Sequence, residues 1–392
     1  MKRKLALGLL LMTAIAAAQP FQHVIIIVQE NRTPDNLFGA SGLPGADLQI
    51  NTTKGVAVTL TTGPHDPPHD YAAYLKQVGG KQPAGAYDYV TSGVQPYWDL
   101  AAQYGWANYM YQTNQGASYP AHQFLISGTS APTDTSNLFV RTEALGKPGC
   151  TAPAPSRAPL IGPNGNAGSV YPCFDRSSLL NLLDAAGLSW RYYSAAPDWN
   201  APNSLKSYYQ SPNLVTKPPQ VLTDIANGSL ANVVWVTPAS AYSDHPGGGS
   251  GGPAWVASIV NAVGQSSYWE NTAILLTWDD WGGWYDHVPP PANNTGWCWF
   301  YCYGFRVPLV VISARTPAGY VDNGAHDFGS ILRFVENNFS LGLIGPGGWA
   351  DSYADDLSAF FTGGLESRKF VPIKARKLTK KELADHGEPD TD

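Results

Sequence analysis

Short apolar runs recur along the chain and predict buried strands. A weaker run covers residues 189–194, and four others are almost continuously apolar, at residues 23–29, 232–237, 273–278 and 307–313. Strands that are apolar at nearly every position are typical of a parallel sheet covered on both faces, because both sets of alternating side chains are then buried. The pattern therefore predicts a central, mostly parallel sheet.

Helical spacing of apolar residues appears between these runs, at residues 179–183, 255–263 and 331–339. We expect Asp175 to cap the first of these helices and Gly187 to end it. Strands that alternate with helices predict a layered α/β fold in which helices flank the sheet.

Two long stretches, residues 132–171 and 243–253, are rich in Gly, Pro, Ser and Asn. Long loops in compact domains often form the walls or lids of functional sites, and we expect that role here.

The N-terminus has the pattern of an export signal. Basic residues at positions 2–4 precede an apolar run at 5–15 that is too short to cross a bilayer. We expect residues 1–18 to be a signal peptide and the protein to be periplasmic or secreted. An uncleaved membrane anchor is the alternative.

The rest of the chain, about 370 residues, suits one large α/β domain or two small ones. We expect a catalytic domain at residues 19–365 and a charged, solvated tail at residues 366–392, although a binding element is an alternative for the tail. The net charge of -6 provides no electrostatic reason to bind nucleic acid.

The cysteines are Cys150, Cys173, Cys298 and Cys302. An even count in an exported protein favours two disulfides. The simplest pairing joins Cys150 to Cys173 and Cys298 to Cys302, but the sequence leaves the pairing open. A metal site of four thiolates is the alternative, and it lacks the usual paired C-x-x-C spacing.

Two polar motifs directly follow predicted strands. Glu30 and Asn31 follow the first strand, and Asp279 and Asp280 follow the strand at residues 273–278. Ligands of open α/β sheets bind beyond the carboxyl ends of the strands, and these oxygen atoms suit a divalent cation. The alternatives are a polar turn for the first motif and a solvated acidic turn for the second.

Adjacent carboxylates repel each other unless a cation lies between them, which favours a cation at Asp279 and Asp280. Gly282 and Gly283 follow in the same loop and allow the backbone to approach a ligand closely. We expect His287 to contact the residues of this loop rather than the ligand itself.

Ser118 follows small residues and precedes an apolar segment, as suits a nucleophile near backbone N–H groups. The alternative is that Ser118 only caps a helix. His69 and His245 could orient a phosphate or protonate a leaving group, or could be structural.

The chain has no H-E-x-x-H, G-x-S-x-G or G-x-x-x-x-G-K-[ST] motif, which disfavours zinc proteases, typical α/β-hydrolases and P-loop enzymes.

Together these motifs resemble the bacterial phosphoesterase family of non-haemolytic-type phospholipases C and related acid phosphatases. The family's E-N-R-S-F-D reads ENRTPD at residues 30–35, and its Y-D-E-N-G-G-F-Y-D-H-V-P-P-P reads WDDWGGWYDHVPPP at residues 278–291. Ser118 stands ahead of a Gly-Thr pair, where the family has its nucleophile. Further matches are SDHP at residues 243–246 and GFRVPLVVIS at residues 304–313.

The resemblance implies a three-layer fold similar to alkaline phosphatases and one divalent metal ion: Mg, Ca, Mn, Zn or Fe. Ser118 would be the nucleophile, with His69 and His245 contacting phosphate or donating a proton. Asp286 and His287, with the two glycines of the loop, would support the metal site. The implied metal ligands are Glu30, Asn31, Ser118, Asp279 and Asp280.

Departures from the family concern the substrate. Thr33 and Pro34 replace the usual Ser-Phe, and His122 stands where phospholipase members often have Arg. Phospholipase members usually have Thr at the position of Ser118, whereas the acid-phosphatase branch uses Ser, which favours phosphomonoesters. A phospholipase C acting on lipid head groups is the alternative. A sulfatase-like or phosphonate-acting enzyme on the same metal scaffold is a competing class, although no C/S-x-P-x-R motif surrounds Ser118, which disfavours a sulfatase. The many Trp and Tyr residues in loops leave a non-enzymatic carbohydrate-binding protein as a further alternative.

Overall fold

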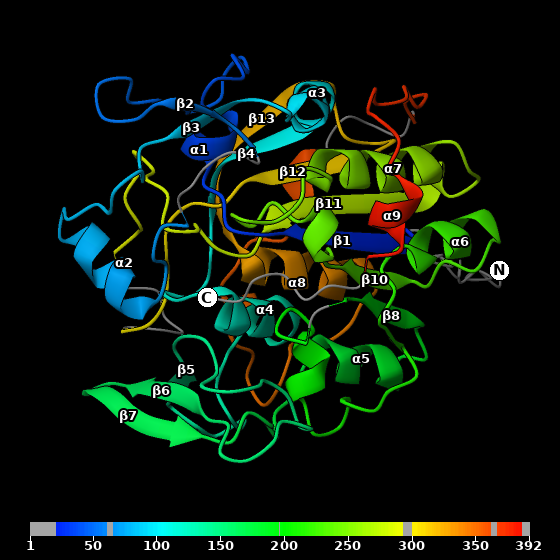
Figure 1. Ribbon diagram of the computed structural model, residues 1–392. Helices are drawn as coiled ribbons and strands as arrows, with labels where there is room; N and C mark the ends of the chain where they lie inside the picture. The colour runs from blue at the N-terminus through cyan, green and yellow to red at the C-terminus, as the bar shows by residue number, and fades with distance from the viewer. Residues whose placement is uncertain (1–20, 61–65, 196, 293–299, 362–366, 386–392) are drawn as a thin grey trace, which may run out of the picture.

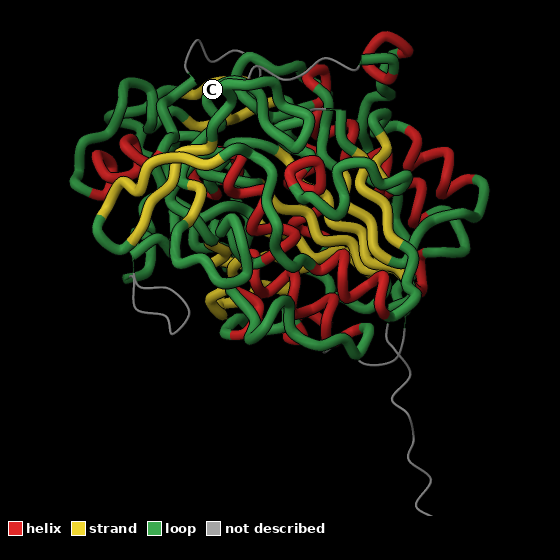
Figure 2. The backbone as a smooth tube through the Cα atoms, turned by 90° about the horizontal axis from the view of Figure 1, so that it is seen from below, coloured by secondary structure: helices red, strands yellow, loops and turns green. Residues whose placement is uncertain are grey.

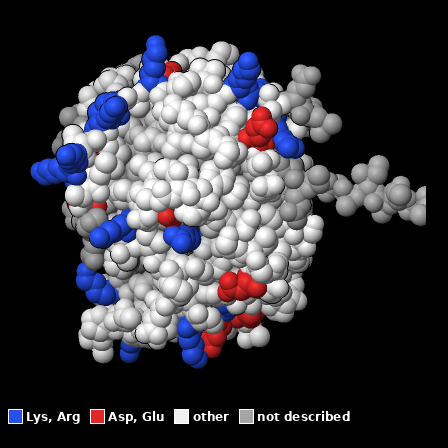
Figure 3. Space-filling model, turned by 90° about the vertical axis from the view of Figure 1, so that its right-hand side faces the viewer, with Lys and Arg blue, Asp and Glu red and all other residues white. Residues whose placement is uncertain are grey.

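The computed structural model describes residues 21–60, 66–195, 197–292, 300–361 and 367–385. The expected signal peptide and Cys298 lie outside the described residues. Charged side chains are sparse and scattered on the face shown in Figure 3, as expected for a chain with 14% charged residues. No helix in the described ranges has both the length and the apolar character needed to cross a membrane.

An eight-stranded sheet runs through the middle of the molecule, in the order β13-β4-β12-β11-β1-β10-β8-β9 (Figure 1). The neighbouring strands pair in parallel except at β12, which is antiparallel to both β11 and β4. The strands are β1 (His23–Gln29), β4 (Gly105–Tyr111), β8 (Trp190–Tyr193), β9 (Leu214–Val215), β10 (Val233–Val236), β11 (Thr272–Trp278), β12 (Leu309–Ser313) and β13 (Tyr320–Asp327).

Helices cover both faces of this sheet (Figure 1). One layer contains α3 (Gln95–Gln103), α6 (Gln220–Ala226) and α7 (Gly252–Gly264), in which α7 contacts both of the others. The opposite layer contains α4 (Ser118–Ser127), α5 (Leu179–Ala185) and α8 (Phe328–Asn338), in which α4 contacts both of the others. The predicted α/β class with a mostly parallel sheet flanked by helices is therefore confirmed.

The central strands are buried on both faces because their sequences are apolar throughout. Every residue of β11 is buried, and so is every residue of β1 after His23. All five predicted strands of the sheet are present, with ends within two residues of those expected.

Smaller elements surround this body (Figure 1). A three-stranded sheet lies beside the main one (Figure 2), within a stretch that was expected to be loop. The remaining elements are α1 (Pro34–Phe38), α2 (Tyr71–Val78), α9 (Lys380–Leu383), β2 (Ala57–Thr59), β3 (Tyr89–Ser92), β5 (Phe139–Val140), β6 (Ala158–Gly162) and β7 (Gly165–Val170). Short 3-10 helices occur at η1 (Ala201–Ser204), η2 (Ser240–Tyr242), η3 (Trp269–Asn271), η4 (Ala350–Ser352) and η5 (Ser358–Phe361).

The start of α5 corrects one expectation. Ser178, rather than Asp175, caps this helix, and it forms a capping box with Asn181. Asp175 instead forms an ion pair of 3.2 Å with Lys206. Both side chains are short polar groups able to cap a helix, so only the backbone conformation at Ser178 decides which one does.

A disulfide and the contacts of the C-terminal segment hold outer parts of the chain in place. Cys150 is disulfide-bonded to Cys173, which confirms that pairing. Residues 367–385, which were expected to belong to a solvated tail, lie against the body: Arg368 donates to two backbone carbonyls at 2.9 Å, and Ile373 is buried. The basic residues favoured a solvated segment, but Phe370, Ile373 and Leu378 pack onto the body.

Candidate active site

The two polar motifs meet because their strands are parallel neighbours in register. Gln29, the last residue of β1, pairs with Trp278, the last residue of β11. The pairing continues beyond the strands, since the N–H of Asn31 donates to Oδ1 of Asp279 at 3.0 Å and the N–H of Arg32 donates to the carbonyl of Asp280 at 3.0 Å. This places the carboxylates and the amide at the carboxyl end of the sheet, as the sequence predicts.

Close packing holds the loop after β11 against Asn31. Asn31 has a φ of 61°, an uncommon conformation for a residue with a side chain, and the φ of Gly282 is 60°. A Cβ atom on Gly282 would lie 2.3 Å from the carbonyl oxygen of Asn31, so only glycine fits there. Gly283 similarly approaches the carbonyl of Pro67, in the segment that leads to His69.

Ser118 reaches the site from α4, of which it is the first residue. The position before it, Ala117, is the N-cap, so Ser118 has no capping role. Its Oγ lies 3.2 Å from Oδ2 of Asp280 and 3.4 Å from Oδ1 of Asn31. The hydroxyl therefore contacts both polar motifs.

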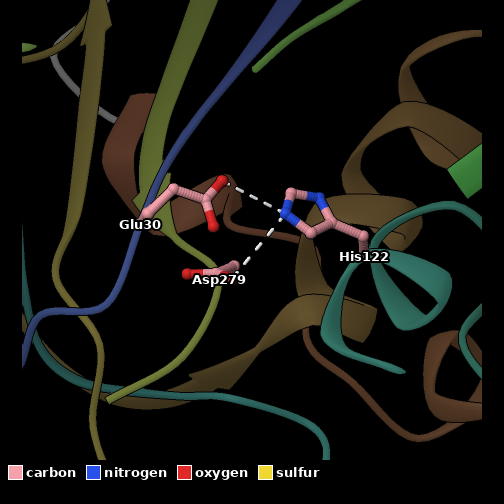
Figure 4. A group of neighbouring side chains, drawn as sticks. All are labelled: Glu30, His122 and Asp279. Carbon is pink, nitrogen blue, oxygen red and sulfur yellow. Dashed lines mark hydrogen bonds and ion pairs between the residues drawn. The ribbon is translucent and has the colours of Figure 1, made fainter. Parts of the chain in front are cut away.

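His122 lies one helical turn after Ser118 and faces the carboxylates of Glu30 and Asp279 (Figure 4). Its Nε2 is 3.2 Å from Oε1 of Glu30 and 3.7 Å from Oδ2 of Asp279. Burial lowers the pKa of His122 to about 4, although the charge of Asp279 opposes this shift. The imidazole is therefore neutral near pH 7.

The site combines three carboxylates that are completely buried: those of Glu30, Asp279 and Asp280. Burying carboxylates is costly unless a cation or several donors compensate them. Oδ2 of Asp279 receives no hydrogen bond from the described part of the chain. The donor set of carboxylate, amide and hydroxyl oxygens thus fits a divalent metal ion.

His69 and His245 lie near each other, with ring centroids 6.2 Å apart. Nδ1 of His69 donates to the carbonyl of Pro67 at 2.8 Å, so its Nε2 accepts from the amide of Asn31 at 2.9 Å. His69 thereby turns Oδ1 of Asn31 toward Ser118. Nδ1 of His245 donates to the carbonyl of Pro246 at 2.7 Å, which makes Nε2 the nitrogen that can carry a transferable proton.

Gln29 and Arg32 hold the segment that carries His245. The amide of Gln29 donates to the carbonyl of Tyr242 at 3.1 Å and accepts from the N–H of Asp244 at 3.1 Å. Arg32 donates to the carbonyl of Asp244 through Nε at 3.0 Å and through Nη2 at 2.6 Å. The position of His245 is thus tied directly to β1.

Asp286 and His287 gather around a buried arginine. Nε of Arg306 donates to Oδ1 of Asp286 at 2.7 Å, and the backbone N–H of His287 donates to Oδ2 of Asp35 at 2.7 Å. Burial raises the pKa of Asp35 to about 6, and the negative charge of Asp286 acts in the same direction. Through these hydrogen bonds, Asp286 and His287 attach the end of the loop after β11 to Arg306 and to Asp35 of α1.

A pocket of about 450 Å³ opens beside the site. Residues 66–70 and 142–145 line it together with Ala117, the neighbour of Ser118. The second segment lies within the long stretch that was expected to form a wall, and its position beside the pocket agrees with that expectation.

Four residues of this region were missed or given little weight from the sequence: Gln29, Arg32, His122 and Arg306. Gln29 and Arg32 flank the first motif, so their position was a signal for a supporting role. The role of His122 depends on its i, i+4 spacing from Ser118, which has meaning only if a helix begins at Ser118.

Comparison with known proteins gives a consistent result. The model of the phosphoesterase family matches residues 21–342. A non-hemolytic phospholipase C from Pseudomonas aeruginosa is 26% identical over 87% of this chain and 57% of that protein, and one from Burkholderia pseudomallei is 27% identical over 87% and 59%. The chain therefore spans less than two thirds of the length of these relatives.

A solved structure of a protein in the alkaline phosphatase superfamily from Vibrio parahaemolyticus is also similar. It is 11% identical, with 87% of this chain and 71% of that chain covered and a TM-score of 0.41. A likeness at that score does not decide the family. The family model, however, covers most of the chain and includes every residue of the site described above. This chain belongs to the phosphoesterase family.

Proposed function

We propose that the chain is a metal-dependent hydrolase of phosphoric esters that uses Ser118 as its nucleophile and forms a phosphoserine intermediate. The observation that carries the proposal is the contact of Ser118 with Asn31 and Asp280, at 3.4 and 3.2 Å, within a group of buried carboxylates. Membership of the phosphoesterase family supports the same reaction class.

The residues that would hold the metal ion are Glu30, Asn31, Ser118, Asp279 and Asp280. A divalent ion bound there would lower the pKa of the Ser118 hydroxyl and neutralise charge on the phosphoryl oxygens. The unsatisfied Oδ2 of Asp279 among the described residues supports this assignment.

In the first step, Oγ of Ser118 attacks phosphorus while the bond to the leaving oxygen breaks. The proton of the hydroxyl is held at Oδ2 of Asp280, which already lies within hydrogen-bonding distance. The leaving alkoxide takes a proton from Nε2 of His245, which acts as general acid. His69 keeps Asn31 oriented during this step.

In the second step, water attacks the phosphoserine and gives its proton to Nε2 of His245. The bond between phosphorus and Oγ breaks, and Ser118 regains its proton from Asp280. Phosphate leaves, and each group is restored to its starting state. The water of the second step enters at the position that the alcohol left in the first step. The same histidine therefore serves first as the acid and then as the base.

The substrate that we propose is a small phosphomonoester, as in acid phosphatases. We also propose that the protein is exported to the periplasm or the medium. The pocket of about 450 Å³ next to Ala117 is of a size for a small organic group. The names of the relatives make a phospholipid head group the second candidate.

Hydrolysis of p-nitrophenyl phosphate and of phosphatidylcholine by the purified chain, with and without divalent metal, separates the candidates. Phosphate released from the monoester alone supports the phosphatase assignment, and phosphocholine released from the lipid supports a phospholipase C. Binding to a polysaccharide with no ester hydrolysis in the presence of metal would instead support the carbohydrate-binding alternative.

A further inference from the structure

The helix that presents Ser118 to Asp280 also presents a nitrogen atom, on His122, to the two other buried carboxylates of the site. Ser118 and His122 are four residues apart at the start of α4, so they share one helical face. Glu30 comes from the end of β1 and Asp279 from the end of β11, and Figure 4 shows both pointing toward the imidazole. Three separate elements therefore converge on one point.

The distances suit atoms that share a metal ion. Ligand atoms at about 2.0–2.2 Å from one ion lie roughly 3 to 4 Å from each other. Nε2 of His122 lies 3.2 Å from Glu30 and 3.7 Å from Asp279, and one ligand atom from each residue lies within 4.8 Å of the others.

A purely structural role for His122 explains less. A hydrogen bond from Nε2 to Glu30 would account for the 3.2 Å contact alone. It would not account for the 3.7 Å approach of Nε2 to Oδ2 of Asp279, a fully buried atom that has no hydrogen-bond donor among the residues that the structure describes. An ion between the imidazole and the two carboxylates would give Nε2 of His122, Oε1 of Glu30 and Oδ2 of Asp279 one shared partner.

We propose that His122 is a nitrogen ligand of the metal centre built on Glu30 and Asp279, and that it makes the centre selective for a transition metal such as Zn²⁺ or Fe²⁺ over Ca²⁺ and Mg²⁺. Imidazole favours the former ions, whereas the latter prefer shells made of oxygen alone. This inference rests on the proposed function, because it concerns the same metal centre.

Metal content is the direct test. Wild-type protein and His122→Gln are dialysed against a mixture of Zn²⁺ and Ca²⁺ without substrate, and the bound metals are measured by mass spectrometry. The variant is expected to bind Zn²⁺ about 100-fold more weakly or worse, since loss of even indirect support of a ligand costs up to that factor. Ca²⁺ binding should change little. His245→Gln is the matched control, and it should keep its Zn²⁺.

X-ray absorption of the zinc-loaded protein keeps the test independent of how the variant folds. Imidazole scattering in the wild type that persists in His69→Gln and His245→Gln supports the inference. Its absence from the wild type, or wild-type Zn²⁺ affinity in folded His122→Gln, would overturn it. Because no step requires turnover, an enzyme that binds zinc through His122 but hydrolyses no ester would contradict only the proposed function.

Discussion

At the scale of single residues, the site depends on a few buried polar groups whose partners come from distant parts of the chain. Ser118 contacts Asn31 and Asp280 although 87 and 162 residues separate it from them in sequence. Each of these side chains is almost completely buried, so an altered partner cannot be replaced easily by bulk water.

Replacing Ser118 by Ala should lower kcat by about 10³-fold or more, in keeping with removal of a covalent nucleophile. The thermal unfolding midpoint should stay close to that of the wild type, because alanine fits the first turn of a helix. Steady-state kinetics with p-nitrophenyl phosphate checks the rate. Near-normal turnover in the folded variant would be incompatible with the covalent mechanism.

Replacing Asp279 by Asn should remove bound metal as well as activity, since a neutral amide is a weaker ligand than a carboxylate for a divalent cation. The amide oxygen introduced by this substitution would still be able to accept the hydrogen bond from the N–H of Asn31, which limits structural damage. Metal content per chain after dialysis is the measurement. Unchanged content would exclude Asp279 as a ligand.

At the scale of elements, the site is formed where parallel strands end and tight loops begin. The positions of Glu30 and Asp279 follow from strand ends that were evident in the sequence, because β1 and β11 are apolar throughout. The contribution of α4 was harder to foresee, since the residues before it form no capping motif. Its helical register is what brings His122 into contact with Glu30.

Three strands of the main sheet were also missed, β4, β9 and β13, and for β4 and β13 the reason is related. β4 begins with glycine and contains a buried asparagine, and β13 is largely polar with an irregular register between Asp322 and Ala325. Neither has the continuous apolar pattern of a central strand, because β13 lies at an edge of the sheet and β4 lies next to it. Their pairing is set by tertiary contacts rather than by local propensity.

Replacing Gly282 by Ala tests the loop after β11. The new methyl group would approach the backbone of Asn31 at 2.3 Å, and the φ of 60° is unfavourable for alanine. Activity should be almost abolished, and stability should fall by more than about 1 kcal/mol. Activity assays and thermal unfolding measure the two effects.

Gly187→Ala is the matched control for this change. Gly187 has a φ of +67°, and no atom lies within 4 Å of the place that the new methyl group would take, so this substitution isolates backbone strain from the steric clash. We expect a modest loss of stability and unchanged kcat. Equal effects of the two substitutions on kcat would mean that the close approach to Asn31 is unimportant.

At the scale of the whole molecule, peripheral contacts fix the layers and the ends of the chain around the sheet. One such contact is His326 at the edge strand β13, whose ring lies 2.9 Å from Asp322 and 2.8 Å from Asp355. Burial alone would lower the pKa of His326, but the hydrogen bonds and charges of the two aspartates together raise it above 6.5.

This pKa shift predicts a pH-dependent contribution to stability. Because the folded pKa is above the unfolded value, the contribution is complete below pH 6.5 and is lost as the pH rises through the folded pKa. His326→Gln should therefore reduce the free energy of unfolding more at acidic than at alkaline pH. Urea unfolding of both proteins at a mildly acidic and a mildly alkaline pH checks this, and a deficit that grows with pH would contradict it.

The central claim is that Ser118 forms a covalent phosphoenzyme, and the stereochemical course at phosphorus tests it most directly. A phosphomonoester made chiral with oxygen isotopes is turned over in the presence of an acceptor alcohol, and the configuration of the product is determined. Two in-line displacements, first by Ser118 and then by the acceptor, predict net retention. Net inversion would show that the acceptor attacks the substrate directly and would contradict the account.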